Sequence, residues 1–191
     1  MRGEAGVEKE KVTRCTWVIG KPTYYIEYHD KVWGKPEYDD QELFKWLSLE
    51  IFHIGLSWQL VLSKYDHFMA AFDHFSYKEI SRYDSVKIEE LMANKNIIRY
   101  RKKIEAIIHN AKKFMEIQKE FESFSSYIWH FTNNKQIIKQ TDKKLTKSAL
   151  SDQVTTDLKK HGFKFIGSVT IYSYLQAVGI INDHDLACDF R

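Results

Sequence analysis

The chain has 191 residues, of which 43% are hydrophobic and 15% aromatic, so it can form one folded domain with a substantial core. Its formal net charge of +3 is too small to indicate nucleic acid binding by itself, and its two cysteines are too few for a disulfide scaffold. No apolar run is long enough for a signal peptide core or a membrane span, so we expect a cytoplasmic protein with no membrane partner.

The N-terminal segment 1–13 is polar and of mixed charge, which predicts a flexible tail. Both prolines lie before residue 40, and beyond them helical periodicity dominates while β-type alternation is scarce. No repeat or low-complexity segment divides the remainder. We therefore expect residues 14–191 to form a single all-α domain, with a monomer as the simplest state.

The first strong helical pattern begins after Asp39, which can form a capping box with Glu42. This helix should run to about Ile54, where Gly55 interrupts it, and Ser57 can cap the next helix. These spacings predict many short helices rather than a regular bundle. The further helices expected are about 58–72, a short helix capped by Ser76, 85–93, 101–121, 124–132, 148–161 and 167–178.

Glu50 falls within the apolar stripe of this first helix, because at 3.6 residues per turn it shares a face with Leu43, Leu47 and Ile54. A carboxylate in such a position is costly unless it is paired or hydrogen-bonded. One interpretation is a structural glutamate held by a backbone amide or an arginine. The other is a carboxylate that faces an apolar pocket and meets a polar or cationic ligand.

Aromatic residues cluster around this position in the sequence. Trp46 precedes Glu50 by one turn, and Trp58 follows the break after the helix. Core packing is the ordinary role of such residues, but a site that sandwiches a flat ring uses the same residue types, so both roles stay open. Five more aromatic residues lie close together upstream: Trp17, Tyr24, Tyr25, Tyr28 and Trp33.

Basic residues concentrate between Arg99 and Lys113, where six of them accompany one acid, Glu105. A local cluster of this kind favours contact with phosphate groups more than the total charge does. A solvated helix face is the alternative interpretation of the same pattern.

Two potential metal ligands lie near each end of the chain, Cys15 with His29 and His184 with Cys188. The i, i+4 spacing of the second pair places both side chains on one face if the segment is helical. A Cys2His2 set suits tetrahedral zinc in a structural site, which would tie the two ends together. A redox or disulfide role for the two cysteines is the alternative.

A series of sequence blocks, in order from about residue 14 to residue 188, resembles the 3-methyladenine DNA glycosylase I family. The most specific are the Glu-x-x-x-x-Gly-Leu-Ser-Trp block at 50–58 and the split Cys/His set. The blocks are Arg14–Trp17, Tyr25–Asp30, Val32–Gly34, Leu43-Phe44, Leu49-Glu50, Gly55–Trp58, Ile97–Arg99 with Arg101–Ile104, His161–Phe165 with Gly167, and Asn182–His184 with Cys188.

The resemblance implies a helix-hairpin-helix DNA glycosylase fold. A zinc-binding segment, formed by about 14–35 and 180–191, would join the termini, and a helical core would span about 39–178. One structural Zn²⁺ per chain is implied, with the family's ligands matched by Cys15, His29, His184 and Cys188.

The implied activity is hydrolysis of the N-glycosidic bond of 3-methyladenine in double-stranded DNA after nucleotide flipping, leaving an abasic site. Glu50 matches the carboxylate that reads the excised base, and Gly55-Leu56 matches the loop that wedges into the gap. Trp58 matches the stacking tryptophan of the base-binding pocket, which Trp17, Tyr25 and Tyr28 complete. The matched DNA-binding residues are Arg99, Arg101, Lys102, Lys103 and Lys164.

Two details qualify this expectation. After Lys103, no acid except Glu105 lies in the place where many relatives have a water-activating aspartate, and no hairpin lysine arrangement indicates a Schiff base, so we expect a monofunctional hydrolase without lyase activity. The run from Ile51 to Ile54 is bulkier than the small or amide residues the family often has there. A non-catalytic or shifted-specificity damage-binding relative is therefore the alternative, and a zinc-stabilised interaction protein is a more remote one.

Overall fold

A computed structural model describes residues 12–191, so most of the expected N-terminal tail lies outside the described residues. Within residues 12–191 the regular secondary structure is helical apart from two short strands, as expected of an all-α protein. The α-helices are α1 (Thr23–Lys31), α2 (Asp40–His53), α3 (Trp58–Ser63), α4 (Tyr65–Ala71), α5 (Tyr77–Ile80), α6 (Ser85–Ala93), α7 (Arg101–Phe121), α8 (Phe124–His130), α9 (Ala149–Lys160) and α10 (Ser168–Ala177). The 3-10 helices are η1 (Thr16–Val18) and η2 (Asp73–Phe75), and the strands are β1 (Ile137–Ile138) and β2 (Ile181–Asn182).

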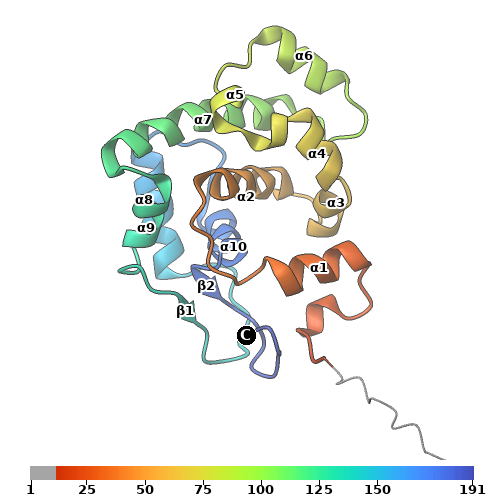
Figure 1. Cartoon of the computed structure of the whole chain (residues 1–191), viewed down its shortest axis with the longest axis vertical. Coiled ribbons are helices and arrows are strands. Elements are labelled where there is room, and N and C mark those ends of the chain that lie inside the picture. The colour runs from red at the N-terminus through yellow and green to blue at the C-terminus, as the bar shows by residue number, and fades with distance from the viewer. Residues whose placement is uncertain (1–11) are drawn as a thin grey trace, which may run out of the picture.

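Helix α2 lies at the centre of the molecule and packs against α7, α8 and α10 (Figure 1). Every residue from Leu43 to Phe52 is buried. A helix on a protein surface buries only one stripe, so burial on all sides marks α2 as the core around which the others pack. Helices α8 and α9 lie on one side of it, α1 lies on the other, and α6 lies at the end of the molecule opposite β1 and β2 (Figure 1).

The caps expected from the sequence begin three of these helices. The Asp39 carboxylate accepts the backbone N–H of Glu42 at 3.0 Å. The reciprocal half of the capping box is not formed, because the Asp39 N–H donates to the Glu37 carboxylate at 2.8 Å and the Glu42 carboxylate pairs with Lys45. Ser57 and Ser76 cap α3 and α5 through their hydroxyl groups.

The helix expected over 58–72 is two helices, so that prediction is wrong in its continuity. The chain leaves helical geometry at Lys64, where φ is −108° and ψ is 10°, and α4 starts at the next residue. Two side chains favour the break. The Ser63 hydroxyl donates to the Leu60 carbonyl at 2.8 Å, and the Lys64 ammonium donates to the Asn96 carbonyl at 2.9 Å.

Helix α1 was not anticipated from the sequence, although it carries a regular buried face. Pro22 precedes it, and the Pro22 carbonyl accepts the N–H groups of Tyr25 and Ile26. The buried residues Tyr25, Tyr28 and His29 have helical spacing. Because these side chains are polar-tipped rings rather than aliphatic groups, an apolar periodicity search does not detect them.

The remaining helices agree with expectation to within two residues at each end, and α7 agrees at both ends. Residues 183–190, after β2, form turns and irregular structure, so His184 and Cys188 do not share a helix face. Strand β2 pairs in parallel with β1, with Ile137 opposite Ile181, and so anchors this C-terminal segment. None of the helices among residues 12–191 is both long and apolar enough to cross a membrane.

Candidate functional site

A cavity of about 170 Å³, here named the aromatic cavity, opens beside the C-terminal half of α2. It contains all five residues that the sequence assigned to base recognition: Trp17, Tyr25, Tyr28, Glu50 and Trp58. The structure adds four that the sequence did not assign to the site: Trp33, His53, Ser173 and Gln176. Trp33 belongs to an aromatic cluster visible in the sequence, but Ser173 and Gln176 lie on α10 and only the fold brings them here.

Glu50 is buried, with 4% of its surface exposed, as its place in the apolar stripe predicted. One carboxylate oxygen lies 3.0 Å from Nδ1 of His53, one turn further along α2. The pKa of Glu50 is raised because burial disfavours the charged carboxylate, and the His53 contact opposes this only in part. Among residues 12–191 the Glu50 carboxylate therefore has one side-chain hydrogen-bond partner, His53, and it borders a cavity rather than solid core.

Aromatic rings form the walls of this cavity. Tyr28 lies edge-on to Trp58 with ring centroids 5.3 Å apart, and Trp17 lies edge-on to Tyr25 at 5.6 Å. The indole N–H of Trp58 is buried and has no hydrogen-bond partner within the described part of the chain. The cavity thus offers flat apolar surfaces together with an unused donor and a carboxylate, which suits a planar ligand carrying polar edges.

The bulky run from Ile51 to Ile54 does not fill the aromatic cavity. Ile51 and Phe52 are buried in the core, where Phe52 packs against Phe68 with ring centroids 4.5 Å apart. Only His53 from this run lines the cavity, and its ring lies 5.1 Å from that of Trp58. The departure in sequence therefore changes the rim of the site and leaves its volume open.

A second hollow of about 300 Å³, here named the groove, adjoins the aromatic cavity and shares Glu50, His53 and Ser173 with it. Gly55 and Leu56 form part of its rim, and Leu56 is 39% exposed. Gly55 has a φ of +79°, and a Cβ there would meet no atom within 4 Å. Glycine is favoured at this position by backbone conformation rather than by space.

The basic residues predicted to contact DNA differ in their availability. Arg99, Lys102 and Lys164 are exposed. Arg101 is shared with Glu89, whose carboxylate lies 2.6 Å from the guanidinium.

The expectation that Lys103 contacts the DNA backbone is wrong. Its side chain turns inward and is 5% exposed, and its ammonium donates to the carbonyls of Phe52 and Ile54 at 2.9 and 2.6 Å. A helical wheel gives the reason, because Lys103 lies on the same face of α7 as Ile107 and Phe114, which are also buried.

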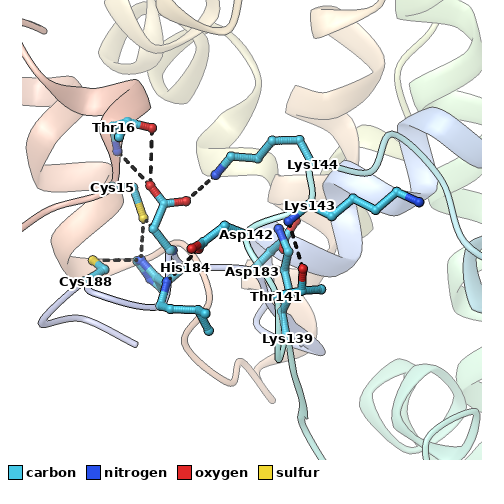
Figure 2. Close-up of polar contacts among 12 residues, drawn as sticks. Cys15, Thr16, Lys139, Thr141, Asp142, Lys143, Lys144, Asp183, His184 and Cys188 are labelled. Atoms are coloured by element: carbon cyan, nitrogen blue, oxygen red, sulfur yellow. Dashed lines mark hydrogen bonds and ion pairs between the residues drawn. The ribbon is translucent and has the colours of Figure 1, made fainter.

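The four predicted metal ligands lie together at the joined ends of the chain. Their ligand atoms all lie within 4.8 Å of one another, and all four residues are buried. The sulfur atoms of Cys15 and Cys188 both approach the His184 ring nitrogen Nδ1, at 3.3 and 3.4 Å (Figure 2). The Cys188 sulfur also lies 3.6 Å from Nε2 of His29. The side chains converge although His184 and Cys188 are not on a helix.

Outer contacts orient both histidines of this cluster. Nδ1 of His29 lies 2.7 Å from the Asp30 carboxylate, and Nε2 of His184 lies 3.0 Å from the Trp33 carbonyl. Each histidine therefore turns its other nitrogen toward the sulfurs, as metal-binding histidines do. Burial raises the pKa of Cys15 to about 12 and lowers that of His184 to about 4. A divalent cation would favour the thiolate and neutral imidazole forms that such ligands need.

Comparison with known proteins shows the family of the chain. The family model described as Methyladenine glycosylase matches residues 17–191. The chain is 43% identical to DNA-3-methyladenine glycosylase of Haemophilus influenzae, over 90% of this chain and 94% of that protein. It is 38% identical to DNA-3-methyladenine glycosylase 1 of Escherichia coli, over 92% and 95% of the two chains.

Solved structures give the same result. A 3-methyladenine DNA glycosylase I variant in complex with 3-methyladenine superposes with a TM-score of 0.88 at 36% identity, covering 93% of this chain and 96% of that one. The 3-methyladenine DNA glycosylase I of Staphylococcus aureus superposes with a TM-score of 0.86 at 38% identity, covering 89% and 92%. The chain described here belongs to the methyladenine glycosylase family.

Proposed function

We propose that this protein is a DNA glycosylase that flips 3-methyladenine out of double-stranded DNA and hydrolyses its N-glycosidic bond, leaving an abasic site. The observation that carries the proposal is the buried carboxylate of Glu50 on the wall of the aromatic cavity. Family membership supports it, and so does the structural match to a relative in complex with 3-methyladenine.

The composition of the cavity favours a base with a positive charge. An adenine alkylated at N3 in DNA is cationic, so its glycosidic bond is already weakened. Electron-rich rings such as Trp58 and Tyr28 attract a desolvated cation by about 0.5–2 kcal/mol each. The Glu50 carboxylate accepts hydrogen bonds from the exocyclic amine and opposes the positive charge, which rewards a neutral adenine less. Recognition and extrusion then supply most of the catalysis.

The groove suits the strand from which the base is flipped. Leu56 projects from the rim, and its insertion into the gap would offset part of the unstacking cost of a few kcal/mol. The exposed cations Arg99, Lys102 and Lys164 suit contacts to phosphates of the duplex. We expect the protein to act as a monomer on this substrate.

The absence of lyase chemistry is part of the proposal. A Schiff-base lyase needs a free amine at the site, whereas the Lys103 ammonium is buried and engaged by two carbonyl groups. The nearby acid Glu105 lies 3.9 Å from the Arg101 guanidinium and is half-exposed, so it is a surface partner rather than a water-activating base.

We also propose one structural Zn²⁺ per chain, held by Cys15, His29, His184 and Cys188. Two sulfurs and two imidazole nitrogens form the donor set of a closed tetrahedral zinc site. The clustering of the ligand atoms and the outer contacts to Asp30 and Trp33 support the assignment over a redox role for the cysteines. The metal would stabilise the fold and take no part in the reaction.

Release of free 3-methyladenine from methylated duplex DNA tests the function. The wild-type protein should release the base, and Glu50→Gln should be slower by about tenfold or more, since it removes a charged hydrogen-bond acceptor. No release above background by the wild-type protein would refute the proposal. Tight binding to abasic DNA without release would favour the damage-binding alternative. That alternative remains in the test because His53 already contacts the Glu50 carboxylate that the base would use.

A further inference from the structure

Lys103 is a buried cation without a carboxylate partner among residues 12–191. Its ammonium donates to the carbonyls of Phe52 and Ile54, which end α2 next to the Gly55-Leu56 loop. The bonds join residues separated by 51 and 49 positions, so they connect the start of α7 to the end of α2. No step of the proposed reaction uses this lysine.

The end of α2 is a natural place for such a cation. The last carbonyl groups of a helix lack partners within it, and the aligned peptide dipoles make that end negative. Burial lowers the pKa of Lys103 because it disfavours the charged form, so the position has an electrostatic cost that the two carbonyl contacts must offset. A methionine of similar length would avoid that cost but would leave both carbonyls unpaired.

Lys103 contacts two segments of this region directly and is linked to a third through Tyr100. The first is the Gly55-Leu56 loop. The second is the stretch from Arg99 to Lys102, where Tyr100 places its ring 5.8 Å from the Lys103 ammonium. The third is the loop before α10, since Phe165 lies edge-on to Tyr100 with ring centroids 6.1 Å apart.

The third segment is itself fixed to α7. The buried side chain of Asn110 donates to the Lys164 carbonyl at 3.0 Å and accepts the Lys164 N–H at 2.8 Å. Phe165 has a φ of +55°, a conformation that non-glycine residues seldom adopt without support from their surroundings. The exposed Lys164 is therefore presented from a backbone held in one position relative to α7.

We propose that Lys103 is a positioning residue that fixes the Gly55-Leu56 loop relative to the DNA-binding surface formed by Arg99, Lys102 and Lys164. Phosphate contacts at that surface then determine the base step at which Leu56 inserts, so backbone binding and insertion occur at a fixed spacing along the DNA. This inference rests on the proposed function. It assigns Lys103 to nucleotide extrusion rather than to phosphate contact, base recognition or bond cleavage.

The test compares Lys103→Met with wild type in two assays. Single-turnover release of 3-methyladenine from DNA should fall by about tenfold or more, because small misplacements of a positioned group are costly. Binding of free 3-methyladenine should change by less than about twofold, because the ligand needs no extrusion. Lys119→Met, an exposed lysine on the same helix outside the basic cluster, should match the wild type in both assays.

A double-mutant cycle separates positioning from a general loss of structure. If Lys103 acts through the wedge, Lys103→Met should add little to the defect of Leu56→Ala, so that the two effects are not additive. Lys103→Gln, which keeps an amide donor group and loses the charge, replaces the methionine variant in the cycle should the latter fail to fold. Its expected defect is smaller and equally non-additive.

The outcomes divide clearly. If the wild-type protein releases the base and the Lys103 variant releases it equally fast, the inference is overturned. Full additivity of the Lys103 and Leu56→Ala defects would also overturn it. Equal losses in free-base binding and in release would also overturn it, because they indicate a structural role alone. No release by the wild-type protein would instead refute the proposed function.

Discussion

Glu50 links stability and function at the scale of a single residue. Its carboxylate is 4% exposed, and within the described chain its ion-pair neighbour is His53, itself partly exposed. Burial raises its pKa, which means that the ionised form is disfavoured in the free protein. A cationic base entering the aromatic cavity would supply the positive charge that the Glu50 carboxylate lacks. The site therefore binds a cationic base more favourably than a neutral one.

The raised pKa of Glu50 predicts the acidic side of the activity profile. The ionised form is lost as pH falls through a pKa above the ordinary value of 4.5, so base release should decline at a higher pH than for an exposed glutamate. An N3-alkylated adenine in DNA keeps its charge over this range, so the titration reports on the protein. Single-turnover release measured against pH checks this, and Glu50→Gln should lack that part of the decline.

The same shift predicts that Glu50 costs stability. An acid whose pKa is raised on folding binds its proton more tightly in the folded state, so stability falls as pH rises from 4.5 through the folded pKa. Glu50→Gln should therefore raise the unfolding free energy at neutral pH by roughly 1 kcal/mol, as removal of a strained functional group often does. Thermal melts should show the gain shrinking toward pH 4.5, and a variant less stable at neutral pH would contradict the argument.

Residue roles could be predicted where one element decides them. Glu50 was found because its burial follows from helical spacing alone, and the same spacing places Lys103 inside, although its basic neighbours suggested a surface role. Ser173 and Gln176 could not be found in this way. They reach the cavity only through the packing of α10 on α2, which no local pattern reports.

At the scale of elements, the start of α7 combines three different roles for consecutive cations. Lys102 is exposed, Arg101 is paired with Glu89, and Lys103 is buried beneath the end of α2. Because consecutive residues on a helix point in different directions, one residue of this basic run faces solvent, one pairs with an acid and one is buried against α2. Arg99 precedes the helix and is exposed like Lys102.

This division predicts different salt dependences of DNA binding. Arg99→Ala and Lys102→Ala should each reduce the slope of log affinity against log salt by about 1, because each removes one phosphate contact. Arg101→Ala should have a smaller effect, since its guanidinium is already shared with Glu89. Titrations at several salt concentrations test this, and an Arg101 effect as large as that of Lys102 would contradict it.

Elements were predictable in proportion to how aliphatic their buried faces are. The long amphipathic α7 matches the expected 101–121 at both ends, with an apolar stripe along its length. Helix α1 escaped notice because its inner face consists of Tyr25, Tyr28 and His29. The break at Lys64 depends on a contact to Asn96 from a distant segment, so the sequence near the break does not reveal it.

At the scale of the whole molecule, the two ends of the chain close one side of the aromatic cavity. Trp17 lies edge-on to His29 with ring centroids 5.1 Å apart, and Trp33 lies edge-on to His184 at 4.7 Å, so the cluster of metal ligands lies directly behind two cavity walls. Backbone contacts join the ends as well, since the Asp189 N–H donates to the Thr13 carbonyl at 3.0 Å. A metal at this place would fix the cavity walls without touching the substrate.

Loss of a zinc ligand should therefore affect stability more than chemistry. Wild-type protein should contain about one zinc per chain. Cys188→Ser should lower the metal content and reduce the unfolding free energy by at least about 2 kcal/mol. Treatment with a chelator should lower the melting temperature of wild type to that of Cys188→Ser and leave the variant unchanged. Full zinc occupancy in Cys188→Ser would disprove the assignment.

The central claim is that an alkylated base binds against Glu50 within the aromatic cavity. Titration of free 3-methyladenine into isotope-labelled protein tests it most directly, through the indole N–H signals of the tryptophans. We expect saturable shifts for Trp58 and Trp17, no such shifts with unmodified adenine, and weaker binding by Glu50→Gln. Saturable binding that leaves the Trp58 signal unmoved, or that Glu50→Gln does not weaken, would contradict this account.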